Sequence, residues 1–149
     1  MRTVTIGFLL LTATLAAAPA LADDGTPVGR WKTIDDASGK EKSIVAIWEE
    51  GGRLFGKVDK LLDPKPDDPD PVCKKCDGEL KDKPFLGMRI LWDLKKDGGK
   101  WSGGKIMDPD NGKSYRCFIT LMEGGKKLLV RGYIGTPLLG RTQTWLREE

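Results

Sequence analysis

The sequence predicts an all-β fold, an up-and-down antiparallel barrel of about eight strands in one domain. Short runs rich in β-branched and aromatic residues alternate with glycine-containing turns at nearly even spacing. No convincing amphipathic helix competes with these runs. Closure into a barrel follows because an open sheet of so many antiparallel strands would expose two edges and a large apolar face. A β-sandwich is the alternative fold.

The first 22 residues are typical of a signal peptide. Arg2 supplies a short positive region, residues 6–18 are apolar, and the motif from Ala20 to Ala22 is of the kind that signal peptidases cleave. The apolar stretch is too short for a permanent membrane helix, although an uncleaved anchor is the alternative. We therefore expect one mature barrel domain, residues 23–149, that does not span a membrane and resides in the periplasm or is secreted.

The strands follow in a regular order. They are predicted over residues 29–34, 43–48, 53–61 and 86–94, in the two arms of a hairpin over 100–121, and over 126–134 and 141–147. Within the third strand, Gly56 suggests the bend or bulge that barrel closure requires. Simple alternation in the strand 86–94 would place Met88, Ile90, Trp92 and Leu94 on one face and Leu91 on the other.

The hairpin turn from Asp108 to Gly112 carries the strongest turn signal, because Asn111 and Gly112 both tolerate positive φ. Its two aspartates also invite a calcium hypothesis. Calcium loops of the EF-hand type require oxygen ligands at alternate positions and a glutamate at the twelfth, which this segment lacks. The sequence therefore predicts a turn that sets strand register, and no metal site.

Residues 63–84 form a long loop rich in proline and aspartate, because proline cannot donate to a sheet ladder. Cys73 and Cys76 in this loop are predicted to form a local disulfide in an oxidising compartment. A bridge from either to Cys117 is the alternative, but Cys117 lies on the predicted core face of its strand. Redox catalysis is disfavoured because no helix follows the motif, and three cysteines without histidine do not make a zinc site.

The composition excludes several classes of function. There is no histidine, which removes Ser-His and Cys-His catalytic arrangements, and we predict neither an enzyme nor a cofactor. The net charge of +3 is too small to indicate a nucleic-acid partner.

A polar group on the last two strands is the remaining candidate site. Arg131 and Tyr133 share one strand face, and Arg141 and Trp145 share another together with Gln143 and Arg147. If these faces meet inside the barrel, the arginines could anchor the carboxylate or phosphate of an amphipathic ligand; if they point outward, they form a solvated surface.

Two more aromatic residues depend on the same register. Tyr115 points either into the barrel or to solvent, and Trp31 either contacts ligand or plugs one end of the barrel with an arginine stacked on its ring. The candidate ligand-binding residues are Trp31, Tyr115, Arg131, Tyr133, Arg141 and Trp145.

Several motifs together resemble the small secreted bacterial proteins grouped as domain of unknown function 2147. They are Gly29-Arg30-Trp31, Cys73-x-x-Cys76, the run from Trp101 to Tyr115, Arg131-Gly-Tyr-Ile-Gly135, and Gly140-Arg-Thr-Gln-Thr-Trp145. The resemblance covers nearly the whole mature chain. It implies an exported lipocalin-like (calycin-type) barrel, and it supplies no catalytic residues.

Three functional hypotheses follow. The first is a periplasmic barrel that binds a small apolar or amphipathic ligand. The second is a solid barrel that acts as an envelope interaction or structural module, with a protein partner docking through the loop 63–84. The third is a thiol redox protein using Cys73 and Cys76.

Overall fold

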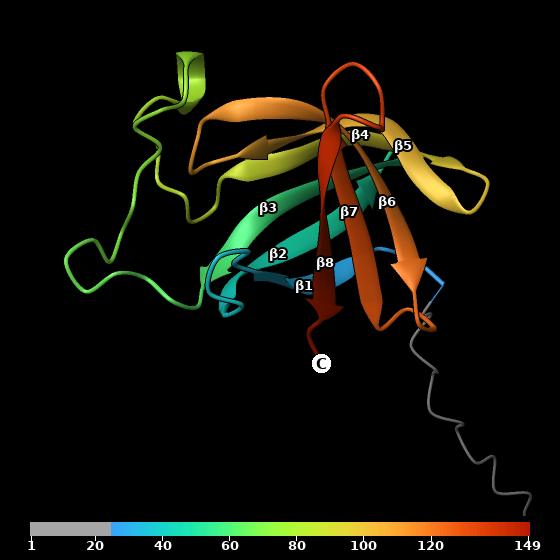
Figure 1. Ribbon diagram of the computed structural model, residues 1–149, viewed down its shortest axis with the longest axis horizontal. Coiled ribbons are helices and arrows are strands. Elements are labelled where there is room, and N and C mark those ends of the chain that lie inside the picture. The colour runs from blue at the N-terminus through green and yellow to red at the C-terminus, as the bar shows by residue number, and fades with distance from the viewer. Residues whose placement is uncertain (1–24) are drawn as a thin grey trace, which may run out of the picture.

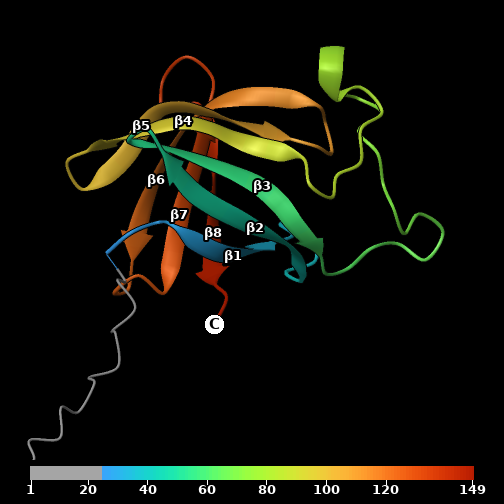
Figure 2. The same cartoon turned by 180° about the vertical axis from the view of Figure 1, so that it is seen from behind.

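The fold is a closed barrel of eight antiparallel strands, seen from opposite sides in Figures 1 and 2. A computed structural model describes residues 25–149, so the predicted signal peptide, residues 1–22, lies outside the described residues. The elements are β1 (Gly29–Ile34), β2 (Glu41–Glu50), β3 (Arg53–Leu61), the short 3-10 turn η1 (Gly78–Leu80), β4 (Arg89–Asp97), β5 (Lys100–Asp108), β6 (Lys113–Met122), β7 (Lys127–Tyr133) and β8 (Gly140–Arg147).

Every strand pairs with its neighbours in the sequence, and β8 closes the ring against β1. At the closure Trp31 lies opposite Arg147, and Lys32 lies opposite Leu146. The predicted up-and-down barrel is confirmed. The sandwich alternative is wrong, because two separate sheets would leave β1 and β8 without each other as partners. Within the described part of the chain, no helix is long and apolar enough to cross a membrane.

The core lies inside the barrel and is built from side chains that alternate inward along the strands. Fully buried members are Trp31, Val45, Leu54, Leu91, Leu94, Cys117, Ile119 and Leu128. On β6 the predicted core face, with Cys117 and Ile119 inside, is confirmed. Each large apolar side chain moved out of water contributes about 1.5–3 kcal/mol, so this cluster stabilises the closed ring.

The simple alternation predicted for β4 is wrong. Leu91 and Leu94 are both buried, although they are an odd number of residues apart. Asp93 adopts a φ of 57°, and the pairing shifts so that Leu94 lies opposite Leu54 while Leu91 lies opposite Gly56. Between these two pairs, two residues of β4 thus face one residue of β3, which is a β-bulge that turns the following side chain back to the inside.

The β3–β4 connection projects from one side of the barrel (Figure 1) and is internally paired. Val72 bridges Pro84, and the backbone N–H of Cys73 donates to the carbonyl of Lys83 at 2.8 Å. Cys73 and Cys76 form a disulfide, as predicted, and Cys117 is a free, buried thiol.

Candidate functional site

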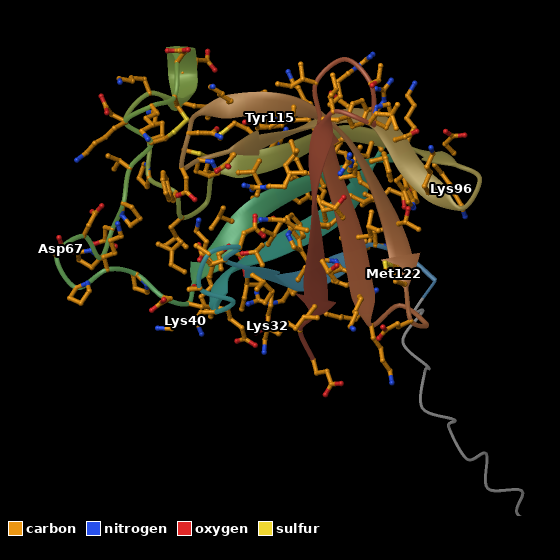
Figure 3. The ribbon with its side chains drawn as sticks, viewed as in Figure 1. Lys32, Lys40, Asp67, Lys96, Tyr115 and Met122 are labelled. Atoms are coloured by element: carbon orange, nitrogen blue, oxygen red, sulfur yellow. A yellow bond between two sulfur atoms is a disulfide. The ribbon has the colours of Figure 1, made fainter. Side chains whose placement is uncertain are left out.

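One end of the barrel is open and contains a cavity of about 610 Å³. Its walls are mainly apolar, and the apolar and aromatic lining residues include Val58, Phe85, Ile90, Ile106, Met107, Val130 and Trp145. Three turns surround the mouth, at residues 35–37, 108–111 and 134–140. In Figure 3 this end carries Tyr115 and Lys40 and faces the side of the long loop, whereas Met122 and Lys96 mark the opposite end.

The opposite end is closed by Trp31, which is fully buried. Its indole N–H donates to the carbonyl of Pro27 at 2.8 Å, and the guanidinium of Arg147 lies 4.3 Å from the centre of its ring. Arg147 also donates to the carbonyls of Thr26 at 2.8 Å and Gly125 at 2.6 Å. Trp31 therefore plugs the barrel and does not line the cavity. The sequence allowed either a ligand contact or an end plug, and the geometry matches the end plug.

The polar group predicted on β7 and β8 is divided between the two faces of the sheet. Arg131 pairs with Thr142, one residue out of step with Arg141, which pairs with Gly132. Because successive side chains point to opposite faces, Arg131 lies outside, where its guanidinium donates to the Thr142 hydroxyl at 2.9 Å. It also donates to the carbonyl of Pro137 at 3.0 Å. The expectation that Arg131 contacts ligand is not met by its placement.

Tyr133 lies at the boundary between the outer face of the barrel and the cavity. It borders the rim of the cavity, but its ring packs outside the barrel, 6.3 Å from that of Phe118. Tyr115, Arg141 and Trp145, in contrast, all line the cavity. The structure thus brings together three of the six candidate residues at the mouth and interior, with Tyr133 at the edge.

A chain of polar contacts crosses the mouth from the barrel interior. The indole N–H of Trp145 donates to the amide oxygen of Gln143 at 3.2 Å, and Gln143 donates to the Asp36 carboxylate at 3.1 Å. Arg141 pairs with the same carboxylate at 3.2 Å and with that of Asp108 at 3.7 Å. Arg141 therefore ties the β1–β2 turn to the β5–β6 turn across the opening.

The β5–β6 turn is itself held by side chains. The Asp108 carboxylate accepts the backbone N–H of Asp110 at 2.9 Å, and Asn111 donates to the Tyr115 hydroxyl at 2.9 Å. Asp110 forms an ion pair with Lys42 of β2, which gives a second tie across the mouth. The aspartates first considered as calcium ligands thus act in the turn and its ion pairs.

Sequence reasoning missed Asp36 and Lys42 as part of this site. Both lie in or beside a turn, where a charged residue is the ordinary solvated choice. Only Asp36 could have been found from the sequence, because it belongs to the pair Asp35-Asp36 at the end of a predicted strand. The Asp35 carboxylate stabilises the turn by accepting hydrogen bonds from it. The strongest effect comes from the backbone N–H of Ser38, which donates at 2.7 Å and lowers the pKa of Asp35.

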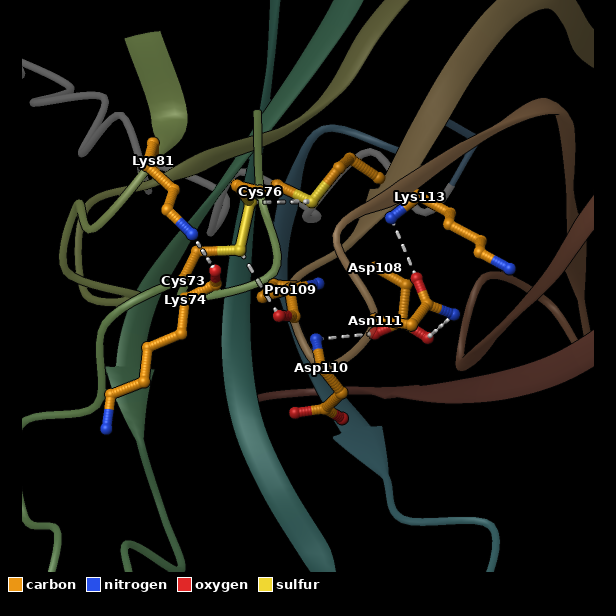
Figure 4. The surroundings of a disulfide bond; sticks show 10 residues. Cys73, Lys74, Cys76, Lys81, Asp108, Pro109, Asp110, Asn111 and Lys113 are labelled. Atoms are coloured by element: carbon orange, nitrogen blue, oxygen red, sulfur yellow. Dashed lines mark hydrogen bonds between the residues drawn. A yellow bond between two sulfur atoms is a disulfide. The ribbon is translucent and has the colours of Figure 1, made fainter. Parts of the chain in front are cut away.

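The disulfide loop packs directly on the β5–β6 turn (Figure 4). The Cys73 sulfur lies 3.3 Å from the carbonyl oxygen of Pro109, and the Cys76 sulfur lies 3.9 Å from the thioether sulfur of Met107. Gly112 has a φ of 70°, and a methyl group added to it would come within 2.1 Å of the Lys75 carbonyl oxygen. Only glycine allows both the turn and this close approach.

Replacement of Gly112 by alanine should therefore lower the free energy of unfolding by about 2–4 kcal/mol, from backbone strain plus overpacking. The matched control is Gly124→Ala, which has a φ of 63° but no atom near the added methyl. That variant should lose only the strain, about 1–2 kcal/mol. Urea denaturation of both variants measures the difference, and equal losses would contradict the contact between Gly112 and the disulfide loop.

Comparisons with known proteins agree with this geometry. The family model described as "Uncharacterized protein conserved in bacteria (DUF2147)" matches residues 29–147. A Helicobacter pylori protein of known structure, described as belonging to the lipocalin family, superimposes with a TM-score of 0.70 at 22% sequence identity, over 82% of each chain. At that identity the likeness shows the fold alone. A search of curated proteins gives no significant match.

Proposed function

We propose that this chain, which belongs to the uncharacterized bacterial family DUF2147, binds a small apolar or amphipathic molecule in the open end of its lipocalin-like barrel. The observation that carries the proposal is the cavity of about 610 Å³ with its mainly apolar walls. Ligand pockets for small molecules commonly enclose about 300–1,000 Å³ and combine apolar walls with a few polar groups. The mouth network around Arg141 supplies such groups.

We also propose that the protein acts in the periplasm or outside the cell. The signal-like segment at residues 1–22 and the Cys73–Cys76 disulfide support this location, because disulfides persist in oxidising compartments. Both cysteines are buried, which favours a structural disulfide over a redox-active one. The cavity likewise favours ligand binding over a solid interaction module.

Titration with the neutral fluorescent probe N-phenyl-1-naphthylamine tests the binding proposal. We expect saturable binding, and we expect Val130→Trp to weaken it about tenfold or more, because Val130 lines the cavity and the indole would occupy it. Thr144→Trp is the matched control, since Thr144 is exposed on the adjacent strand and the same side chain would point to solvent.

Circular dichroism and thermal melting establish that each variant is folded. If Val130→Trp does not fold, Ile106→Trp serves instead, because Ile106 is a half-buried cavity residue. Absence of saturable binding by the parent protein, or equal probe affinity in a folded cavity variant and Thr144→Trp, would overturn the proposal.

A further inference from the structure

We infer that the cavity selects an amphipathic molecule with a cationic head, of the alkylammonium class, over an anionic molecule of the same chain length. The inference rests on the proposed function and adds the chemical class of the ligand. It also reverses the role that sequence reasoning assigned to Arg141, which was to anchor a carboxylate or phosphate.

The charges around the mouth are mostly negative. The ionisable carboxylates and bases that line the cavity are Asp35, Asp36, Asp108, Asp110, Lys42 and Arg141. Four carboxylates therefore face two cations, and the lining carries a net charge of −2 at neutral pH. A cleft with low-dielectric walls and one predominant sign of charge attracts the opposite charge and repels the same one.

Both cations at the mouth are already paired. Arg141 lies between the carboxylates of Asp36 and Asp108, at 3.2 and 3.7 Å, and Lys42 pairs with Asp110. A ligand carboxylate would have to displace one of these partners, which would leave an aspartate without its counter-charge beside the incoming anion. Among the described side chains, moreover, no fully buried nitrogen or oxygen atom lacks a hydrogen-bond partner.

A cationic head finds complementary groups in the same region. The Asp36 carboxylate contacts Arg141 and Gln143 through the same oxygen, Oδ2, so within the described chain its other oxygen is available to a cation. Trp145, Tyr115 and Phe85 supply aromatic lining for an alkylammonium group, since aromatic ring faces attract cations. The apolar chain would then lie against the walls formed by residues such as Val130.

Displacement of the neutral probe by three amphiphiles with the same twelve-carbon chain tests this selectivity. The competitors are dodecyltrimethylammonium, dodecanoate and uncharged dodecanol, at pH 7 and low ionic strength. The two charged amphiphiles are used below their micellar concentrations, and dodecanol is used below its solubility limit. We expect the cation to bind at least about fivefold more tightly than the anion, and the difference to shrink in high salt. Equal binding of cation and anion, or tighter binding of dodecanoate, would overturn the inference.

The neutral competitor separates the two proposals. If dodecanol displaces the probe while the charged pair shows no preference for the cation, the cavity binds ligand and only the charge inference fails. If none of the three displaces the probe and the probe itself does not bind, the proposed function fails as well.

Removal of the Arg141 charge gives an independent test. Arg141→Gln frees Asp36 and Asp108, so affinity for dodecyltrimethylammonium should rise about three- to tenfold. Arg116→Gln is the matched control, because Arg116 is exposed on β6 and its loss changes the net charge equally. An unchanged or weakened affinity for the cation in Arg141→Gln, relative to this control, would contradict the inference.

Discussion

Trp31→Ala should lower the free energy of unfolding by about 3–5 kcal/mol, the largest loss expected from a single substitution in this protein. Trp31 is fully buried, and it joins three parts of the structure at the closed end. Its ring packs under Arg147 of β8, and its indole N–H binds the carbonyl of Pro27 before β1. Alanine would leave a cavity at this end and would leave the Pro27 carbonyl without its donor. The loss falls where the barrel closes, because only two residue pairs join β1 to β8.

Urea denaturation of the purified protein measures this loss. Trp48→Ala is the control, because Trp48 is a tryptophan of β2 that is not fully buried and stacks on Phe55 at a centroid distance of 6.0 Å. We expect Trp48→Ala to cost much less than Trp31→Ala. Since Trp31 lies away from the cavity, the folded Trp31→Ala protein should also keep its affinity for the neutral probe. A loss similar to that of Trp48→Ala would contradict the role of Trp31 as the end plug.

The free thiol of Cys117 should react with iodoacetamide about a thousandfold more slowly in the folded protein than in the unfolded chain. Burial raises the pKa of Cys117 from 9.0 to about 12, because the thiolate would lose its hydration inside the barrel. The reactive species is the thiolate, so a shift of this size removes nearly all of it at pH 8. The side chain is also fully buried, which blocks the reagent.

Mass spectrometry after timed alkylation, with and without urea, measures the two rates. Cys117→Ala should incorporate no label under either condition while the Cys73–Cys76 disulfide remains intact, and it therefore reports any reduction of the disulfide. Rapid single labelling of the folded parent protein would show that Cys117 is accessible and would contradict its placement in the core.

The same pKa shift predicts how stability responds to alkaline pH. Above pH 9 the unfolded chain releases the Cys117 proton, whereas the folded protein retains it until about pH 12. The unfolded state then binds fewer protons than the folded state, so this group lowers stability as pH rises through that interval. Cys117→Ala should accordingly lose less stability than the parent protein between pH 9 and 11 in urea denaturation.

Much of the fold could be predicted because its signals are local. The bounds of β1 and β3 matched the prediction, because turn-forming residues such as Gly51 and Pro64 border the strands and residues with β preference fill them. Cys73 and Cys76 are too close in sequence for their pairing to depend on distant contacts. In β4 the same reasoning failed at Asp93, because a bulge arises from pairing with β3 and has no reliable signature within the strand itself.

The candidate site was only partly predictable, because its composition depends on register and on turns that meet across the barrel. Arg131 and Arg141 carry the same chemical group, yet one lies outside and the other at the mouth, since a single residue of register exchanges the two faces. Asp36 and Asp108 are distant in sequence and belong to two turns. Their meeting on Arg141 follows from barrel closure alone.

The sequence by itself determined the strand order, the turns and the local disulfide, because backbone preferences and alternating hydrophobicity act over a few residues. Tertiary structure alone decided that Trp31 plugs one end, that the other end holds a cavity, and that aspartates outnumber cations at its mouth. Those properties arise when strands distant in sequence close into a ring, which sets the inner face of every strand and the turns that share an end.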